Sequence, residues 1–154
     1  MDRTLIAKYE AGGPELAASI QGLSEHDLAA HPVPGTWNIR DIVIHMMDSD
    51  LIASDRMKRI ATMEKPLIVG YDETGFSNLP AYKSLDLAVA CDIFAKNRQL
   101  TAEVLRSLPD EAFARVGIHT EKGKVTLADV VQTYVGHWEH HRKFIREKRA
   151  LLGK

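Results

Sequence analysis

The chain has 154 residues, of which 45% are hydrophobic and 27% are charged, and its formal net charge is −1. These values are typical of a soluble globular protein, and the length fits one domain over residues 1–154. The balanced charge lacks the basic excess that proteins use to hold nucleic acid, so no nucleic-acid partner is expected.

The sequence gives no sign of export or of a membrane anchor. Its apolar runs are short, whereas a spanning helix needs roughly 20 mostly apolar residues. The start of the chain, Met1–Leu5, turns polar too early for a secretory signal. Cys91 is the only cysteine, which excludes an internal disulfide and a cysteine-built zinc site. We therefore expect a cytoplasmic protein with no membrane partner, and its seven histidines are the candidates for metal chemistry.

The first predicted helix spans Asp2–Leu23, with apolar residues on one side. Gly12-Gly13-Pro14 interrupts this pattern and predicts a kink or a break. A short helical turn should follow, capped by Ser24 with Asp27 at the capping-box position.

The second predicted helix spans about Asn38–Met63. Asn38 is a good N-cap, and Asp41 lies in the first turn, where a carboxylate suits the helix dipole. Prolines, glycines and polar residues fill the stretch 64–83. This stretch predicts a long crossover, and crossovers of this length are often functional. It is therefore a candidate cover for a pocket.

The third predicted helix spans Ser84–Leu108, with Ser84 at its start. Residues 114–125 contain two glycines among β-branched residues and predict a small hairpin or an extended loop. Thr126 and Asp129 then begin the last helix, which runs to about Leu151. The predicted fold is all-α: an antiparallel four-helix bundle with a long crossover between helices two and three.

One side of the last helix carries residues spaced three or four apart, which share a face. They are Leu127, Val130, Tyr134, His137, His141, Phe144 and Lys148. All but the last are expected to face the core. The two histidines lie one turn apart, with Cβ atoms roughly 5–6 Å from each other, so both can reach one ion. His140 lies off this face and is expected at the edge or in solvent.

The second helix repeats the signal with one histidine. Its stripe contains Ile42, His45, Ser49 and Ile52. His45 should therefore point inward, and bundle metal sites are built from inward side chains of facing helices. Three imidazoles suit zinc, nickel, copper or iron and leave a coordination position open. The alternative is structural, because most single core histidines are simply hydrogen-bonded.

Two blocks of the sequence resemble the DinB/YfiT-like metalloenzymes. The first is PGTWNIRDIVIHMMD at residues 34–48, where a tryptophan after a Pro-Gly loop precedes an inward histidine. The second is GKVTLADV at residues 123–130, followed by HWEHH at residues 137–141. The resemblance covers almost the whole chain in element order, and its specific part is the combination of the two blocks.

The resemblance implies an antiparallel four-helix bundle and a divalent metal ion, often nickel or zinc, bound by His45, His137 and His141. It also implies a homodimer. Activities in that family include transfer reactions and isomerisations that depend on small thiols such as bacillithiol or mycothiol. A small-molecule substrate, possibly with a low-molecular-weight thiol, is therefore expected.

Arg98 lies on an apolar stripe of the third helix. A buried unpaired charge is costly, so this arginine needs a partner. Asp48 or Asp92 would serve, or an anionic substrate held by two parallel hydrogen bonds. The plainer interpretation is a side chain with a buried stem and an exposed head.

Asp48 and Asp41 flank His45 on its helix, and either is a candidate to hydrogen-bond the non-ligating nitrogen of a histidine. Trp37 and Trp138 are interpreted mainly as packing residues, with pocket lining as the alternative. Because Trp138 directly follows His137, the H-E-x-x-H pattern of zinc peptidases is absent.

These features predict a metal-dependent enzyme, either a small-thiol transferase or a hydrolase, since the ion could lower the pKa of a thiol or of a water molecule. The alternative is a non-catalytic protein that binds a metal or a small ligand in a stress response. A purely structural role for the histidines is a third possibility.

Overall fold

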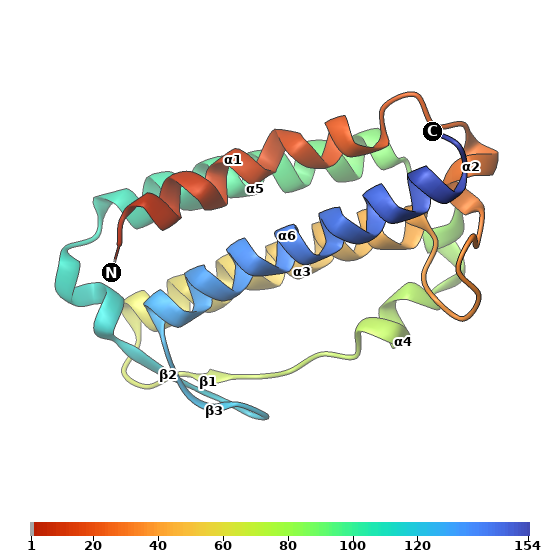
Figure 1. Cartoon of the computed structure of the whole chain (residues 1–154). Coiled ribbons are helices and arrows are strands. Elements are labelled where there is room, and N and C mark those ends of the chain that lie inside the picture. The colour runs from red at the N-terminus through yellow and green to blue at the C-terminus, as the bar shows by residue number, and fades with distance from the viewer. Residues whose placement is uncertain (1) are drawn as a thin grey trace.

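The computed structural model describes residues 2–154, which form a bundle of four long helices (Figure 1). The long helices are α1 (Thr4–Ile20), α3 (Ile39–Thr62), α5 (Leu87–Ser107) and α6 (Leu127–Leu151). The shorter elements are α2 (Glu25–Ala29), β1 (Leu67–Ile68), α4 (Glu73–Ser77), the 3-10 helix η1 (Pro80–Ser84), the 3-10 helix η2 (Asp110–Ala114), β2 (Val116–His119) and β3 (Gly123–Thr126). The predicted four-helix bundle with its crossover is confirmed.

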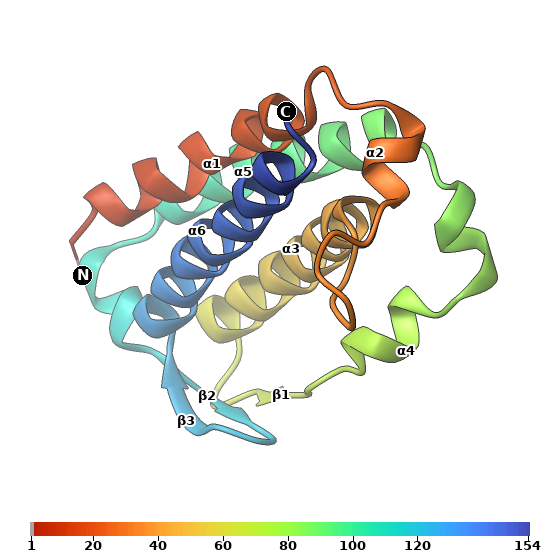
Figure 2. The same ribbon diagram turned by 45° about the vertical axis from the view of Figure 1, so that its right-hand side comes forward.

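The long helices run in two directions, as Figures 1 and 2 show. Helices α1 and α6 point one way, and α3 and α5 point the other. The neighbouring pairs α1–α5 and α3–α6 are therefore antiparallel, while α3–α5 and α1–α6 are parallel. The crossover causes this arrangement, because it carries the chain from the end of α3 back along the bundle before α5 begins.

Side-chain caps start three of the helices where the sequence predicts them. Reciprocal capping boxes join Ser24 to Asp27, Asn38 to Asp41 and Thr126 to Asp129. The predicted start of the third long helix at Ser84 is wrong, since that residue ends η1. Asp86 is the cap instead, and its Oδ1 accepts a hydrogen bond from the Ala88 amide at 2.8 Å.

The first helix was predicted to kink or break at Gly12-Gly13-Pro14, and the break is wrong. Helix α1 continues through Pro14 and ends at Ile20, before the predicted Leu23. Gly12 and Gly13 are buried, and a Cβ on Gly13 would lie 3.2 Å from the Cα of Ala95. These glycines therefore let α5 approach α1 closely and do not end the helix.

The predicted hairpin is present as β2 and β3, paired in antiparallel fashion from Val116↔Thr126 to His119↔Gly123. Strand β1 of the crossover adds to it in parallel, with Leu67 opposite Ile118. The sheet order is β1-β2-β3. The hairpin thus fixes the first part of the crossover at one end of the bundle, and the rest passes along α3 (Figure 1).

The core consists of two apolar clusters along the bundle. Tyr9 belongs to the first and Phe94 to the second. The guanidinium of Arg98 lies between their rings, with its Cζ 4.5 Å from one ring centroid and 4.4 Å from the other. Within residues 2–154, no helix combines the length and apolar character needed to cross a membrane.

Candidate metal centre

The structure brings His45, His137 and His141 together between α3 and α6. The Nε2 atom of His137 lies 3.1 Å from that of His45 and 3.1 Å from that of His141. One nitrogen from each ring can be chosen so that all three lie within 4.8 Å of one another. His45 and His141 are buried and His137 is half-buried. The antiparallel packing of α3 against α6 places these distant stretches of chain at one point.

Hydrogen bonding alone does not explain this convergence. A neutral imidazole has one N–H donor and one acceptor nitrogen. The Nε2 of His137 carries either one hydrogen or one lone pair and can therefore make one good hydrogen bond, yet it faces two other Nε2 atoms. Nitrogens that each lie about 2.0–2.1 Å from one tetrahedral ion are separated by roughly 3.3 Å. The donor type and the spacing therefore fit a divalent ion.

Burial keeps the three imidazoles neutral. It lowers the pKa of His45 to about 4. Burial, and then the charges of the other two rings, lowers the pKa of His137 to about 3. Burial and the charge of His45 lower the pKa of His141 to about 3. Neutral rings have free lone pairs, which metal binding requires.

The surroundings of the histidines differ from the expectation for Asp48. Its Oδ2 accepts a hydrogen bond from the Tyr82 hydroxyl at 2.7 Å, so Asp48 binds the crossover and not a histidine. The Ser49 hydroxyl lies 3.5 Å from Nδ1 of His137. The Nδ1 atom of His141 is buried and has no hydrogen-bond partner in the part of the chain that the structure describes.

The two tryptophans have different roles. The Trp37 ring lies against the centre, with its centroid 4.8 Å from that of His45 and 6.4 Å from that of His141. Trp138 packs inside the core, where its indole N–H donates to Glu15 at 2.7 Å. Trp138 is therefore a packing residue, whereas Trp37 lines the pocket that reaches His141.

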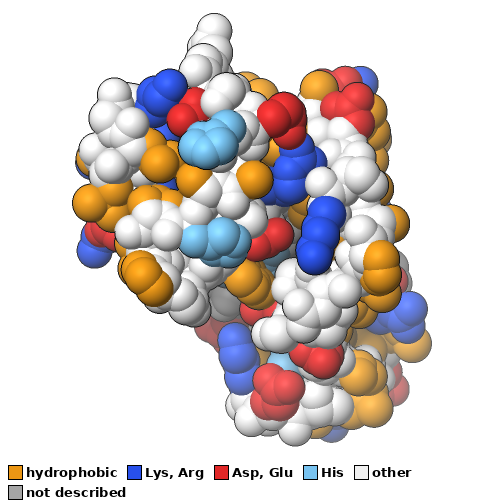
Figure 3. All heavy atoms as spheres, turned by 90° about the vertical axis from the view of Figure 1, so that its right-hand side faces the viewer, with side chains coloured by type: hydrophobic (Ala, Val, Ile, Leu, Met, Phe, Trp, Pro, Cys, Tyr) orange, Lys and Arg blue, Asp and Glu red, His pale blue; other side chains and the backbone are white. Residues whose placement is uncertain are grey.

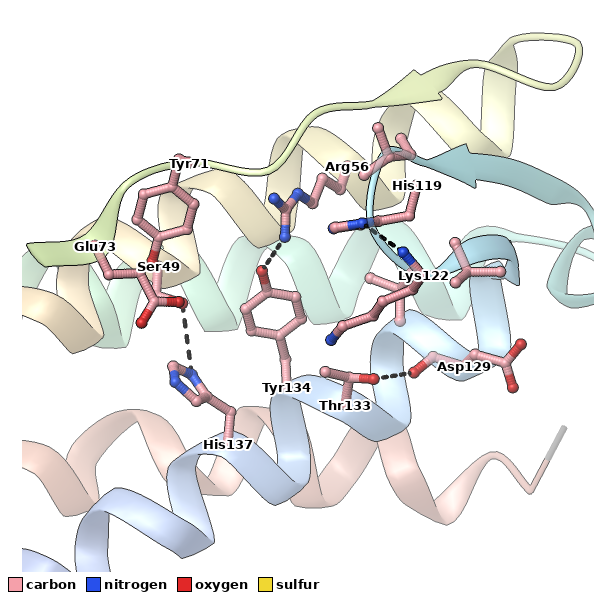
Figure 4. Close-up of a pocket in the computed structure, with 13 residues that line it drawn as sticks. Ser49, Arg56, Tyr71, Glu73, His119, Lys122, Asp129, Thr133, Tyr134 and His137 are labelled. Atoms are coloured by element: carbon pink, nitrogen blue, oxygen red, sulfur yellow. Dashed lines mark hydrogen bonds between the residues drawn. The ribbon is translucent and has the colours of Figure 1, made fainter.

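A cavity opens on each side of the histidine cluster. A polar cavity of about 130 Å³ reaches His137, and Figure 4 shows its lining residues from α3, the crossover, the hairpin and α6. An apolar pocket of about 210 Å³ reaches His141 and includes Trp37 and Phe144. An ion held by the cluster would therefore be approached from two sides, one that includes charged side chains and one that is mainly apolar.

Two residues of the last helix deviate from the predicted core face. Phe144 is 37% exposed and lines the apolar pocket. Lys148, which was expected outside the core, is only 4% exposed. Its ammonium donates to the Thr36 hydroxyl at 2.7 Å. Lys148 is thus covered by the loop before α3, and Phe144 faces the pocket beside that loop.

Arg98 is not positioned to hold a substrate. It is 0% exposed, and it pairs with Asp50 at 2.9 Å instead of Asp48 or Asp92. Its two remaining nitrogens donate to the carbonyl oxygens of Tyr9 and Tyr134 at 3.1 and 3.0 Å. Every nitrogen of the guanidinium is therefore bonded within the core, and the expectations of a substrate clamp or of an exposed head are wrong.

Three of the residues that line the polar cavity beside His137 were missed from the sequence: Arg56, Tyr71 and Glu73. Arg56 continues the helix stripe that contains His45, Ser49 and Ile52, so one more turn of the same periodicity would have found it. Tyr71 and Glu73 come from the crossover, whose path over the centre has no periodic signal. Figure 3 shows histidine, acidic and basic side chains on the face that lies at the right in Figure 1.

Known proteins are similar to this chain in both sequence and fold. The sequence profile of the DinB superfamily matches residues 8–145. YfiT from Bacillus subtilis, described as a probable metal-dependent hydrolase, is 29% identical over 140 residues, which cover 90% of this chain and 79% of YfiT. A Bacillus cereus protein with the same provisional hydrolase name is 29% identical over 149 residues, 97% of this chain and 86% of its own.

Solved structures agree with these matches. The structure of YfiT superposes with a TM-score of 0.93 at 28% identity and covers 97% of this chain and 86% of its own. It is described as a four-helix bundle of unusual topology. A mycothiol-dependent maleylpyruvate isomerase superposes with a TM-score of 0.70 at 10% identity, covering 90% of this chain and 58% of its own, which shows a shared fold.

Proposed function

Because the chain belongs to the DinB superfamily, and three inward imidazoles meet in its bundle, we propose that it is a metal-dependent enzyme acting on a small molecule. His45, His137 and His141 hold the ion, with nickel or zinc as the expected metal. The observation that carries this proposal is the pair of 3.1 Å contacts made by the Nε2 of His137. Further support comes from relatives that are named as metal-dependent hydrolases.

A divalent ion held by three neutral rings keeps its double charge and an open position, and it lowers the pKa of a thiol or of water. The protein's own residues prepare the place for this. Trp37 and Tyr134 pack their rings against the histidines, which limits access of bulk water. The two cavities leave room for a nucleophile and an electrophile on opposite sides of the cluster.

Our first candidate for the nucleophile is a low-molecular-weight thiol, as the family resemblance suggests. In this reaction the thiol loses its proton, the sulfur forms a bond to an electrophilic carbon, and a leaving group on that carbon, such as the halide of an aryl halide, departs with its bonding electron pair. Water is the second candidate, and the hydrolase names of the relatives favour it. A protein that binds a metal or a small ligand without turnover is the non-catalytic alternative.

The test begins with the metal content of the purified protein and compares two variants. His141→Ala removes a member of the cluster, whereas His140→Ala removes its exposed neighbour and serves as the matched control. We expect about one nickel or zinc ion per chain in the wild type and in His140→Ala, and a large loss in His141→Ala.

Turnover is then measured with small thiols and a model aryl halide, and separately with activated esters. Metal-dependent conjugation identifies a thiol transferase, and metal-dependent ester cleavage identifies a hydrolase. Equal metal content in both histidine variants would overturn the proposed centre. A full complement of metal without turnover of either kind would favour the binding protein.

The same resemblance suggests a homodimer, and the single cysteine suggests the cytoplasm as its location. Sedimentation at several protein concentrations tests the first, and localisation of a tagged chain tests the second. Neither property is needed for the centre, whose three ligands all come from one chain.

A further inference from the structure

The polar cavity beside His137 has a wall of hydrogen-bond donors from three separate elements. From this wall we infer a binding site for the carboxylate group of a small organic acid, with Arg56 of α3 as its anchor. This inference deepens the proposed function, since it names the chemical class of the substrate. A carboxylate held here would place the rest of its molecule next to the histidine cluster.

Arg56 has hydrogen-bonding capacity to spare. Its Nη1 donates to the Tyr134 hydroxyl at 2.9 Å, and its Nη2 donates to the carbonyl oxygen of Val69 at 2.7 Å. These two bonds use two of the five N–H groups of the guanidinium, and no carboxylate of residues 2–154 forms an ion pair with this arginine. Two neutral oxygens thus fix the guanidinium in place and leave its charge uncompensated. A planar guanidinium fixed in this way is well suited to bind a carboxylate.

His119 of β2 adds a second donor. Its Nδ1 accepts hydrogen bonds from the amides of Glu121 and Lys122 at 3.1 and 3.4 Å. The proton of the neutral ring therefore resides on Nε2. Burial, followed by the charges of Arg56 and Lys122, lowers the pKa of His119 and keeps the ring neutral. No hydrogen bond within residues 2–154 uses this Nε2–H, and His119 lines the cavity.

The charged residues around the cavity favour an anion near the hairpin. Lys122 is the second cation and forms no ion pair in the described chain. The acids that line the cavity are Glu73 and Asp129. Asp129 is occupied in the cap of α6, where its Oδ2 accepts from the backbone and hydroxyl of Thr126. Glu73 comes from the crossover, and Figure 4 shows it on the side of Ser49 and His137, away from His119.

The cavity is large enough for a short carboxylic acid but not for a large molecule. Its volume is about 130 Å³, and the same space is lined by Arg56 and by His137. The Tyr134 ring connects the two, because its hydroxyl contacts Arg56 and its centroid is 5.9 Å from that of His137. A short carboxylic acid can therefore contact the arginine at one end and approach the metal centre at the other.

The experiment uses succinate as the probe and its neutral diamide, succinamide, as the matched compound. Binding is measured by calorimetry and by thermal stabilisation at constant ionic strength, on the metal-loaded protein and again after chelation. Both are needed because a carboxylate also binds metal ions directly. We expect succinate, but not succinamide, to bind in both states.

Arg56→Gln should weaken succinate binding at least about tenfold, which is the size expected for the loss of a charge-assisted hydrogen bond. Arg146→Gln is the matched control, because it removes the same charge from an exposed position outside the cavity. His119→Phe tests the site independently, should Arg56→Gln fail to fold. It removes the donor and leaves the arginine, and we expect it to weaken binding severalfold.

Equal succinate affinity in the wild type and in Arg56→Gln would overturn the inference, as would an equal loss in Arg146→Gln, which would indicate general charge attraction. Because binding to the chelated protein needs no ion and no turnover, the test can fail while the metal-dependent reaction stands. The reverse also holds: succinate binding that depends on Arg56 would survive the finding that the protein is not an enzyme.

Discussion

Desolvation controls the protonation of the three histidines at the candidate centre. It is the largest cause of the lowered pKa at each of them, and no carboxylate of residues 2–154 is among the groups that shift these pKa values. The centre therefore consists of neutral donors, so an ion bound there would retain its full charge. This balance is a property of individual residues and can be tested through pH.

The metal-free protein should lose stability as the pH falls from about 6.5 toward about 4. The unfolded histidines take up protons near the ordinary pKa of 6.5, whereas the folded values for His45, His137 and His141 are about 4, 3 and 3. The unfolded chain thus binds more protons in this window, and the free energy of unfolding rises with pH until about 6.5.

Urea unfolding of the chelated protein at several pH values measures this slope. His137→Ala should show a shallower slope than the wild type, because one of the three depressed groups is gone. The exposed His140 supplies the control, and His140→Ala should keep the wild-type slope. Stability that is flat from pH 7 to pH 4.5 would contradict the prediction.

Lys148 provides a second test at the residue scale. It is 4% exposed, and its hydrogen-bond partner is the neutral hydroxyl of Thr36. Burial lowers its pKa, because a desolvated ammonium without a carboxylate is costly. Lys148→Met should therefore raise the free energy of unfolding at pH 7 by about 1 kcal/mol. A loss of stability, measured by urea unfolding, would show that the bond to Thr36 outweighs the desolvation cost.

Some elements of the fold are set by neighbouring residues in the sequence, and others are set by contacts with distant parts of the chain. Helix starts are local, so the capping boxes at Asn38 and Thr126 lie where their residue types predict them. The course of α1 through Gly12, Gly13 and Pro14 is not local, since close packing against α5 and α6 holds that stretch in the helix. The crossover is likewise held by distant partners, through the pairing of β1 with β2 and through Tyr82 on Asp48.

Two glycine substitutions test how closely the elements approach one another. A Cβ at Gly12 would lie 2.5 Å from Nη1 of Arg98 and 2.8 Å from Cδ1 of Trp138. Gly12→Ala should therefore destabilise the protein by about 2 kcal/mol through overpacking. Gly136 lies within α6 with no atom within 4 Å of such a Cβ. Gly136→Ala should stabilise the helix by roughly 0.5–1 kcal/mol.

Thermal and urea unfolding of both variants provide the measurement. The opposite signs make the comparison sharp, because the same chemical change is made in two helices of one bundle. If Gly12→Ala were as stable as Gly136→Ala, then the close contact of α1 with Arg98 and Trp138 would not hold in solution.

At the scale of the whole molecule, one buried ion pair connects all four long helices. Arg98 of α5 bonds Asp50 of α3 and the backbone carbonyls of Tyr9 in α1 and Tyr134 in α6. The carboxylate of Asp50 also accepts a hydrogen bond from the Tyr9 hydroxyl at 3.1 Å and one from the side-chain amide of Asn97 at 2.8 Å. This network joins both diagonal pairs of helices, α1 with α3 and α5 with α6.

Breaking this network should have a large effect. Asp50→Asn leaves a buried arginine without a countercharge, so we expect a loss of about 3–5 kcal/mol in the free energy of unfolding. Asp92→Asn is the matched control, because it breaks an exposed pair with Lys96 and should change stability little. Similar losses in the two variants, measured by urea unfolding, would contradict a central role for the buried pair.

The sequence by itself indicated the inward faces of the two helices that carry the histidines, apart from Phe144 and Lys148, because a helix repeats every 3.6 residues whatever surrounds it. That periodicity identified His45, His137 and His141, and with the two sequence blocks it indicated the family and the bundle. One domain over residues 1–154 stays a prediction of the same kind. Only the tertiary structure decided which arginine is buried and which lines a cavity.

Arg98 and Arg56 both lie on inward faces, yet the first is enclosed by all four helices and the second lines a cavity beside the candidate metal centre. The difference depends on the offset between neighbouring helices and on the path of the crossover. Both are set by contacts between residues that are far apart in the chain, and no local pattern carries that information.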